Sequence, residues 1–416
     1  MKQLVVTGGT TLRGVIPISG AKNSAVALLP AAILCNGVVT IHNVPNISDI
    51  EAIKEILLYL GANITCKENS IMIDSRDIKN QTISETMATK LRASYYFMGA
   101  LLGRFQACNM SLPGGCPIGA RPMNLHLEGF ETLGCTITPE NNQYIVTAKE
   151  LKGDDIDVQH SVGATINLLF ASVLAHGETR IHQAAMEPEI TNVIELLQQM
   201  GADIKGTGTD ELIVSGVSQL HDAEITVIPD RIEAGTYLIA GALCGEQLEI
   251  TNVYPDHITA LLETLQQMGV PLQIQDQSII VSKPETVYPC EIETAVYPGF
   301  PTDLQQPITP LMTMASGLSK ITETIYENRF KHVPYLNQMG ADIKVEQRLL
   351  AIIGPTELHG STVEATDLRA GASLVLASLI AKGQTFITEV NHILRGYENI
   401  VEKLQSVGAK IELREI

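Results

Sequence analysis

Leu60-Gly61-Ala62-Asn63-Ile64 carries a pattern that returns five more times along the chain. In each copy a large apolar residue precedes a glycine, and a small residue, a variable residue and an apolar residue follow it. The glycines are separated by steps of 73, 67, 68, 71 and 68 residues. They are Gly61, Gly134, Gly201, Gly269, Gly340 and Gly408. A period of about 70 residues predicts a chain built from six copies of one supersecondary unit.

Each copy is predicted to contain two helices of different character. An amphipathic helix precedes the glycine, as in residues 50–60, where apolar residues recur at helical spacing. The glycine is expected to end this helix as its C-cap, and an alternating segment such as residues 211–214 predicts a strand after it. The second helix is rich in Ala, Leu, Ser and Gly, and a helix that is apolar on all sides must be buried. These buried helices are expected at residues 23–34, 93–102, 164–175, 235–243, 306–316 and 371–381.

The repeat also predicts the domain organisation. Three copies would enclose three buried helices inside a ring of sheets and outer helices, so six copies make two α/β domains. The 416 residues exceed one ordinary core, which agrees with two domains. We expect one domain at residues 22–229 and a second formed by residues 1–21 and 230–416, with the active site in the cleft between them. The first strand, residues 3–18, is expected to pack with the C-terminal block.

Composition limits the kind of partner. The chain has 28 basic and 46 acidic residues and a net charge of −18, which disfavours non-specific nucleic-acid binding. Seven cysteines without a metal-type spacing favour a reduced, cytoplasmic setting and argue against a zinc site. No signal peptide or membrane-spanning run is predicted. An anionic ligand would therefore need a local cationic pocket.

Cationic residues gather at one place in the repeat. Lys22, Arg92, Arg231 and Arg369 lie at the heads of predicted buried helices. Helix N-termini carry free N–H groups and partial positive charge, so six such heads favour an anion site. For any single head, ordinary capping is the simpler interpretation.

A loop at residues 112–122 contains Cys116 among three glycines and three prolines, and Arg121 follows five residues later. Such a composition excludes a helix interior or a central strand. A nearby cation lowers the pKa of a thiol and favours the reactive thiolate. The alternative interpretation is a glycine-rich turn with an inert cysteine.

The chain resembles the UDP-N-acetylglucosamine enolpyruvyl transferases in eight blocks, which follow in family order over essentially its whole length. The blocks are residues 19–23, 113–122, 187–190, 229–236, 298–303, 327–330, 365–369 and 395–398. The resemblance implies a fold of two inside-out α/β barrel domains, each with three repeats, as in EPSP synthase.

The resemblance also implies a reaction. The enolpyruvyl group of phosphoenolpyruvate moves to the 3′-hydroxyl of UDP-N-acetylglucosamine by addition and elimination through a tetrahedral ketal, and phosphate is released. This is the first committed step of peptidoglycan biosynthesis, and it needs neither a metal nor an organic cofactor. Two alternatives remain. One is an enolpyruvyl transferase for another acceptor such as shikimate 3-phosphate, and the other is a non-catalytic paralogue that binds the nucleotide sugar.

The site residues follow from matching motifs. Phosphoenolpyruvate carries a phosphate and a carboxylate, and arginine suits the bidentate binding of such oxyanions. The sugar hydroxyl needs a base, for which Asp303 is the match, and the vinyl carbon needs an acid, for which Cys116 is the candidate. The implied catalytic residues are Lys22, Cys116 and Asp303. The implied phosphoenolpyruvate ligands are Lys22, Asn23, Arg92, Arg121, Arg369 and Arg395. The implied nucleotide-sugar ligands are Asn23, Arg92, Arg121, Pro122, Met123, Asn124, Leu125, Ser161, Val162, Gly163, Asp303 and Ile325.

Some features depart from these expectations or have a simpler explanation. Asn124 and Leu394 stand where the family pattern has Asp, which suggests a divergent or second copy. Asp303 has the alternative role of helix cap, Arg329 that of a structural ion pair, and His126 that of a structural histidine. The partners implied are the two small-molecule substrates and the epoxide antibiotic fosfomycin, which alkylates Cys116 in this family. No nucleic acid or membrane partner is expected.

Overall fold

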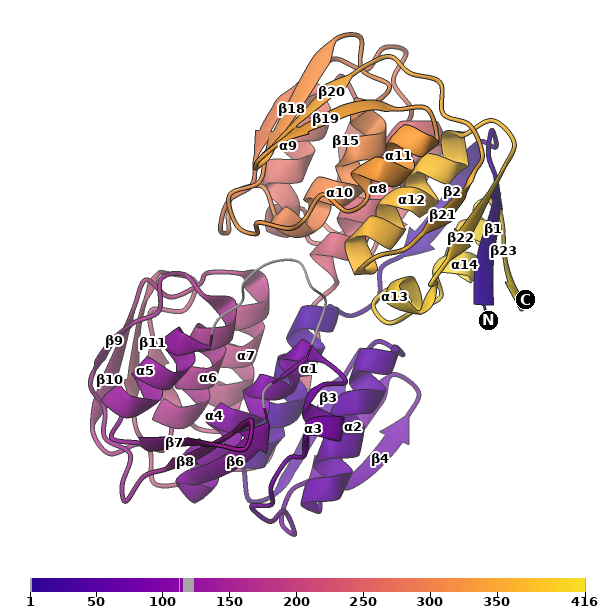
Figure 1. Cartoon of the computed structure of the whole chain (residues 1–416). Coiled ribbons are helices and arrows are strands. Elements are labelled where there is room, and N and C mark those ends of the chain that lie inside the picture. The colour runs from indigo at the N-terminus through magenta and orange to yellow at the C-terminus, as the bar shows by residue number, and fades with distance from the viewer. Residues whose placement is uncertain (1, 112, 115–122, 416) are drawn as a thin grey trace. The chain divides into compact units, whose positions relative to one another are not determined.

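The computed structural model describes residues 2–111, 113–114 and 123–415 (Figure 1). These residues separate into two units. The N-terminal unit contains residues 20–111, 113–114 and 123–228, and the C-terminal unit contains residues 2–19 and 229–415. The fold class predicted from the repeat, α/β with six similar copies, is confirmed, and the described residues form six small sheets.

Three sheets are found among the described residues of the N-terminal unit. The first has the order β13 (Ala223–Thr226), β3 (Val38–His42), β5 (Ser70–Asp74), β4 (Asn63–Lys67). The second has the order β6 (Ala107–Ser111), β8 (Gln143–Thr147), β7 (Thr136–Glu140). The third has the order β11 (Asp203–Lys205), β12 (Glu211–Ser215), β10 (Glu178–His182), β9 (Asp155–Asp157). In the first and third, one edge strand pairs in parallel and the other pairs are antiparallel.

The described part of the C-terminal unit also has three sheets, each with four strands. One has the order β15 (Leu272–Ile274), β16 (Ser278–Val281), β14 (Gly245–Thr251), β2 (Leu12–Pro17). The next has the order β17 (Glu291–Glu293), β18 (Leu318–Thr322), β20 (Leu349–Ile353), β19 (Asp342–Glu346). The last has the order β21 (Thr362–Glu364), β22 (Gln384–Thr388), β1 (Lys2–Thr7), β23 (Lys410–Glu415).

The N-terminal segment forms two strands instead of the single strand expected at residues 3–18. Strand β1 pairs with β22 and β23, whereas β2 pairs with β14 in another sheet. Two glycines separate the strands. Gly9 has φ +82°, and a Cβ on Gly8 would lie 2.1 Å from the carbonyl oxygen of Ala381. The chain can turn between sheets here because neither position carries a side chain.

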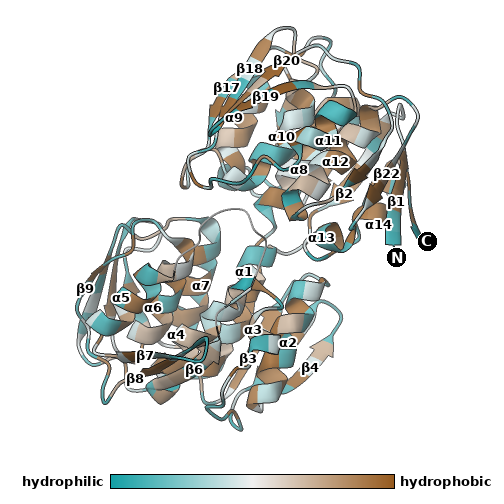
Figure 2. Cartoon of the chain, in the orientation of Figure 1, coloured by the Kyte–Doolittle hydropathy of each residue, from teal (hydrophilic) through white to brown (hydrophobic). Residues whose placement is uncertain are grey.

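Six central helices lie where the all-round apolar segments predict them. The N-terminal unit has α1 (Lys22–Ala31), α4 (Tyr96–Phe105) and α6 (Val162–Ser172). The C-terminal unit has α8 (Arg231–Cys244), α10 (Thr302–Met312) and α12 (Leu368–Ile380). The 3₁₀ turns η1 (Ala32–Leu34) and η2 (Arg92–Tyr95) extend α1 and precede α4. Within the C-terminal unit, α8, α10 and α12 pack against one another, and in the other unit α4 packs against α6. Figure 2 shows apolar residues in several of these helices, whereas α10 and the start of α1 also carry hydrophilic residues.

The outer helices end at the repeated glycines. They are α2 (Ser48–Leu60), α5 (Asn124–Thr132), α7 (Pro188–Gln199), α9 (Thr259–Gln267), α11 (Val333–Gln338) and α14 (Ile400–Ser406). All six glycines have left-handed φ values between +84° and +107°. Gly61 is the C-cap of α2, as predicted, whereas each of the other five glycines directly follows the C-cap residue of its helix, a position at which a left-handed glycine also ends a helix. Short helices also occur, namely α3 (Glu85–Ala88), η3 (Pro255–Ile258) and α13 (Asn391–Leu394). In the part of the chain that the structure describes, no helix has the length and hydropathy needed to cross a membrane.

Candidate active site

Asp303, in the first turn of α10, lies at the centre of a cluster of charges. Its Oδ1 accepts a hydrogen bond from Nη2 of Arg329 at 2.5 Å. Its Oδ2 accepts from Nη2 of Arg369 at 3.0 Å and from Nε of the same residue at 3.3 Å. The helix has Pro301 as its N-cap and no side-chain cap, so Asp303 does not have the capping role considered above. About a quarter of its side chain is exposed (25%), whereas the two arginine side chains are buried.

Both arginines are fixed by aromatic rings and by local backbone structure. Arg369 lies in the first turn of α12, whose N-cap Asp367 accepts hydrogen bonds from the N–H groups of residues 369 and 370 at 3.0 Å. Its guanidinium carbon lies 5.3 Å from the ring centroid of Tyr397. Arg329 follows β18 in the chain, and its guanidinium carbon lies 5.2 Å from the ring centroid of Tyr326. These cation–π contacts compensate part of the cost of burying the guanidinium groups.

The arginines determine the protonation of Asp303. Burial alone would raise the pKa of the carboxyl group, but the charges of Arg369 and Arg329 outweigh it and hold the pKa well below its usual value. Asp303 is therefore a carboxylate at any physiological pH. In this arrangement it is a strong hydrogen-bond acceptor, and it becomes a stronger base only when its contact with a guanidinium weakens.

A buried carboxylate connects this cluster to the turn that carries Ile325. The hydroxyl of Thr302 donates to Oε2 of Glu323 at 2.8 Å and accepts from Nη1 of Arg329 at 3.1 Å. Oε1 of Glu323 accepts the N–H groups of Ile325 and Tyr326 at 2.9 and 3.0 Å. The predicted residues Asp303, Arg369 and Ile325 thus belong to one network. Thr302 and Glu323 were not predicted as members of the site, because burial of a single glutamate leaves no periodic signal.

Lys22, the first residue of α1, makes an ion pair in the N-terminal unit. Its Nζ lies 3.0 Å from Oδ2 of Asp49, a buried residue in the first turn of α2. The Lys22 side chain is mostly buried, with 14% exposed, whereas the neighbouring Asn23 is an exposed residue. Asp49 was not predicted, although an acidic residue in the first turn of a helix is common. It compensates the charge of Lys22.

Several predicted nucleotide-sugar ligands of the N-terminal unit lie close together. A Cβ on Gly163, in the first turn of α6, would lie 2.8 Å from Oη of Tyr95 and 3.0 Å from Cε1 of His126. The guanidinium carbon of Arg92 lies 5.8 Å from the Tyr95 ring centroid. His126 belongs to the first turn of α5, which begins with the predicted ligands Asn124 and Leu125. The structure therefore brings the start of α5, the start of α6 and Arg92 together, and adds Tyr95 as a residue that sequence reasoning missed.

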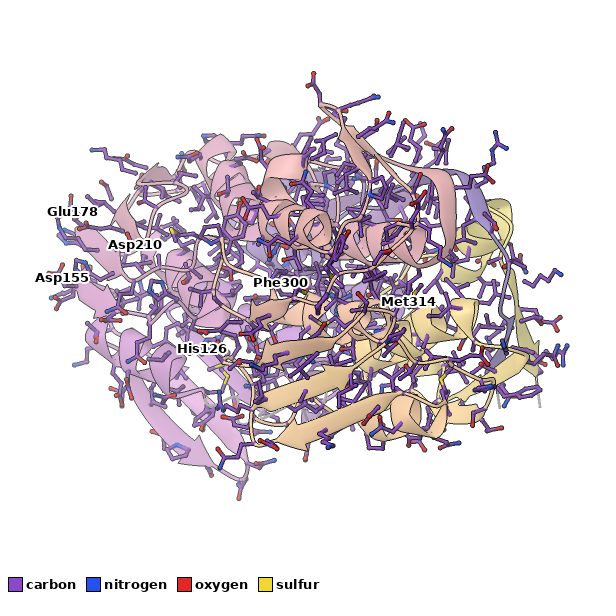
Figure 3. All side chains as sticks on the ribbon, turned by 90° about the horizontal axis from the view of Figure 1, so that it is seen from above. His126, Asp155, Glu178, Asp210, Phe300 and Met314 are labelled. Atoms are coloured by element: carbon purple, nitrogen blue, oxygen red, sulfur yellow. The ribbon has the colours of Figure 1, made fainter. Side chains whose placement is uncertain are left out.

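His126, labelled in Figure 3, is a structural histidine. Its Nδ1 lies 2.9 Å from Nδ2 of Asn167, whose Oδ1 accepts the N–H of Gly99 at 2.8 Å. Since the amide nitrogen donates, Nδ1 accepts and the ring proton is assigned to Nε2. Burial, with a contribution from Arg92, lowers the pKa of His126 to about 3. The ring is neutral, which supports the structural interpretation over a catalytic one.

The heads of the central helices are not uniform. Asp230 caps α8 by accepting from the N–H groups of Ile232 and Glu233 at 2.8 and 3.0 Å, and Asp367 caps α12 in the same way. A carboxylate of the chain thus occupies the position at which an anion would bind. At these two heads the structure shows ordinary capping, the simpler interpretation for a single head, because each aspartate accepts two of the free N–H groups of its helix. Ser161 caps α6, with its hydroxyl oxygen 3.3 Å from the nitrogen of Ala164.

The remaining predicted residues are placed as follows. Cys116, Arg121 and Pro122 lie outside the described residues. Met123 is the buried N-cap of α5, and Val162 is the first residue of α6. Arg395 is the C-cap of α13, directly after Leu394, which packs against the core of the C-terminal unit.

Six cysteines are described, and all are free thiols. Burial raises the pKa of five of them, to about 11 or 12, and Cys66 is exposed. The five are Cys35, Cys108, Cys135, Cys244 and Cys290. Among the described residues, no group of three His, Cys, Asp or Glu side chains is arranged to hold a metal ion.

Comparison with known proteins defines the class. The profile of the EPSP synthase family (3-phosphoshikimate 1-carboxyvinyltransferase) matches residues 6–404. The crystal structure of the enolpyruvyl transferase NikO from Streptomyces tendae has a TM-score of 0.90 and 26% sequence identity, and the match covers 99% of this chain and 98% of that chain. EPSP synthase from Acinetobacter baumannii shares the fold, with a TM-score of 0.76 and 19% identity over the whole of both chains. The chain belongs to the EPSP synthase family of enolpyruvyl transferases.

Closer relatives identify the group within this family. UDP-N-acetylglucosamine 1-carboxyvinyltransferase 2 from Bacillus subtilis (strain 168) is 49% identical over 414 residues, which cover 99% of this chain and 96% of that protein. The protein of the same name from Listeria monocytogenes is 49% identical over 411 residues, with 98% and 97% covered. The chain therefore belongs with the UDP-N-acetylglucosamine 1-carboxyvinyltransferases, which confirms the resemblance seen in the sequence blocks.

Proposed function

We propose that the protein is a transferase that moves the enolpyruvyl group of phosphoenolpyruvate to the 3′-hydroxyl of UDP-N-acetylglucosamine. The observation that carries this proposal is 49% identity over 99% of the chain to relatives named for this activity. The reaction supplies the first committed intermediate of peptidoglycan biosynthesis, and we place it in the cytoplasm, in keeping with six free thiols.

The proposed chemistry has two steps. In the addition, the sugar hydroxyl gives its proton to a base and its oxygen bonds to C2 of phosphoenolpyruvate, while C3 receives a proton from an acid. In the elimination, C3 loses a proton and the bond between C2 and the phosphate oxygen breaks, which releases phosphate. We assign the base to Asp303 and the acid to Cys116. Cys116 is also the proposed site of alkylation by fosfomycin.

Two sets of residues are proposed to bind the substrates. Lys22, Arg121 and Arg395 bind phosphoenolpyruvate, together with Asn23, Arg92 and Arg369. The start of α5 (residues 123–125), the start of α6 (residues 161–163) and Ile325 bind the nucleotide sugar with Arg121 and Pro122. The ion pairs seen at Lys22 and Arg369 mean that each anionic substrate must compete with an internal carboxylate, Asp49 or Asp303. Competition of this kind weakens non-specific anion binding.

The test is phosphate release from phosphoenolpyruvate with UDP-N-acetylglucosamine as the acceptor. We expect turnover by the parent protein and a loss of at least about 100-fold in kcat for Asp303→Ala, since the variant removes the proton acceptor. Release with shikimate 3-phosphate instead would assign another acceptor. Binding of the nucleotide sugar without any phosphate release would identify a non-catalytic paralogue.

A further inference from the structure

A partly buried hydroxyl and a buried carboxylate lie behind the arginine that contacts Asp303. Glu323 has no exposed surface and Arg329 is 3% exposed. The two are joined through the Oγ1 atom of Thr302, at 2.8 Å from Glu323 and 3.1 Å from Arg329. Nothing in the proposed chemistry uses this pair, although it is one contact away from the proposed base.

The hydrogen-bond polarity of this chain of groups is fixed. A carboxylate only accepts, so Glu323 receives the N–H groups of Ile325 and Tyr326 and the proton of the Thr302 hydroxyl. With its proton directed to Glu323, Thr302 presents a lone pair to Nη1 of Arg329. Arg329 then donates through Nη2 to Asp303. Each bond polarises the next, and such a network has a single arrangement.

We propose that Thr302 and Glu323 are positioning residues, which fix the Arg329 guanidinium and through it the Asp303 carboxylate in the orientation that receives the acceptor hydroxyl. This inference rests on the proposed function. It also gives the turn at Ile325 a mechanical link to the proposed base, because Glu323 binds that turn through two backbone N–H groups.

The surroundings of Asp303 make its orientation sensitive to Arg329. Arg329 and Arg369 act on Asp303 directly, and the charged or titratable groups that contact or act on these arginines and their neighbours are Glu323, Asp367, Asp230, His332 and Tyr397. The two guanidiniums are the groups that bond to it directly among the described residues. Without its contact to Thr302, the Arg329 guanidinium is held less firmly against Asp303, so Arg369 orients more of the carboxylate and the pKa of Asp303 moves up toward its usual value.

Stability alone is a weak explanation for this arrangement. Burying Glu323 and Arg329 costs desolvation energy that their mutual attraction seldom exceeds, so buried ion networks often stabilise a protein no more than apolar side chains would. The network costs desolvation energy and lies one hydrogen bond from the proposed base, Asp303. Its presence is better explained by the orientation that it imposes on Arg329 and Asp303.

The experiment compares Thr302→Val, which keeps the shape and removes the hydroxyl, with Thr302→Ser, which keeps the hydroxyl. For Thr302→Val we expect kcat to fall about tenfold, as for loss of one hydrogen bond to a charged group, while KM for phosphoenolpyruvate stays within about twofold. The acid side of the kcat pH profile should move to higher pH. Thr302→Ser should remain within about threefold of the parent enzyme in kcat. Glu323→Gln, whose amide would donate to Thr302 and reverse the polarity of the bond, should resemble Thr302→Val.

Thr313→Val is the matched control, since this buried threonine follows the other end of α10 and its hydroxyl donates to the carbonyl of Pro310 at 2.7 Å. An unchanged kcat in Thr302→Val, or an equal loss in Thr313→Val, overturns the inference. So does a fall in kcat without a shift of the pH profile, because a structural effect would produce that result. Failure of the proposed function is distinct, since the parent protein would then release no phosphate.

Discussion

His332 is a buried residue whose protonation opposes folding. Its ring has no exposed surface, and its Nε2 lies 3.2 Å from Oγ1 of Thr309. Burial lowers the pKa of His332 to about 3, with the charge of Arg329 acting in the same direction and that of Asp367 against it. In the unfolded chain His332 is therefore protonated below about pH 6.5, whereas in the folded chain it stays neutral down to about pH 3. Between these values, stability falls as the pH falls.

We expect His332→Gln to remove part of this pH dependence. Between pH 7 and pH 5, one such histidine lowers the free energy of unfolding by about 2 kcal/mol in the parent protein. The variant should lose less stability over this range than the parent does, as measured by urea unfolding at several pH values. His221→Gln, at an exposed position, should retain the parent slope. Equal slopes for the parent and His332→Gln would show that His332 is not neutral in the folded protein.

At the residue scale, some members of the candidate site could be predicted from the sequence and others could not. Lys22, Asp303 and Arg369 were identified because their motifs match those of a family. Asp49, Thr302 and Glu323 were missed, since each acts through a partner distant in sequence, and such a partner leaves no local pattern. The low pKa of Asp303 was also not foreseen, because it depends on two arginines that the fold brings together.

At the scale of elements, the glycine after each outer helix is predicted to contribute to stability through its backbone conformation. Gly134 follows α5 with φ +92°, and a Cβ added there would lie 3.4 Å from its nearest contact, the carbonyl oxygen of Glu150. A side chain therefore has room, and the cost of a substitution comes mainly from the left-handed φ. We expect Gly134→Ala to lower the free energy of unfolding by about 1–2 kcal/mol, measured by urea denaturation.

The matched variant is Gly134→Asn, since asparagine adopts the left-handed region more readily than alanine. Both substitutions introduce a Cβ at the same place, so a difference between them reports the cost of the backbone conformation. Gly134→Asn should therefore be less destabilising than Gly134→Ala. If the two substitutions cost the same, crowding by Glu150 rather than backbone conformation would explain the glycine, and the C-cap argument would not hold at this helix.

Elements were predicted well where one segment contains its own signal. Most central helices are almost free of charge and rich in small and apolar residues, although α10 also buries Gln305, Gln306 and Thr309. The outer helices combine an apolar face with a terminal glycine, so both types could be located from sequence. Strand partners were harder to predict. Residues 3–18 were expected to form one strand, because alternation shows which residues lie on one face but not which sheet a strand joins. The division into β1 and β2 depends on the turn at Gly8 and Gly9.

At the scale of the whole molecule, residues that are close in sequence can belong to different hydrophobic cores. Leu4, in β1, has no exposed surface and belongs to the core of the C-terminal unit. Leu28, in α1, is equally buried but belongs to the core of the N-terminal unit. The two leucines are close in sequence, yet removal of each side chain should affect a different set of elements. This contrast tests whether the discontinuous C-terminal unit behaves as one cooperative structure.

Leu4→Ala should weaken the C-terminal unit by about 2–5 kcal/mol, the usual cost of such a cavity in a core. In hydrogen–deuterium exchange, protection should fall first in β22 and β23, the two strands that pair with β1, although they lie almost 400 residues away in sequence. Leu28→Ala should instead reduce protection in α2 and α7, against which α1 packs. Equal loss of protection across both units in each variant would mean that the two cores unfold together. Because local stability follows the elements that share a core, the distant strands are the decisive ones to measure.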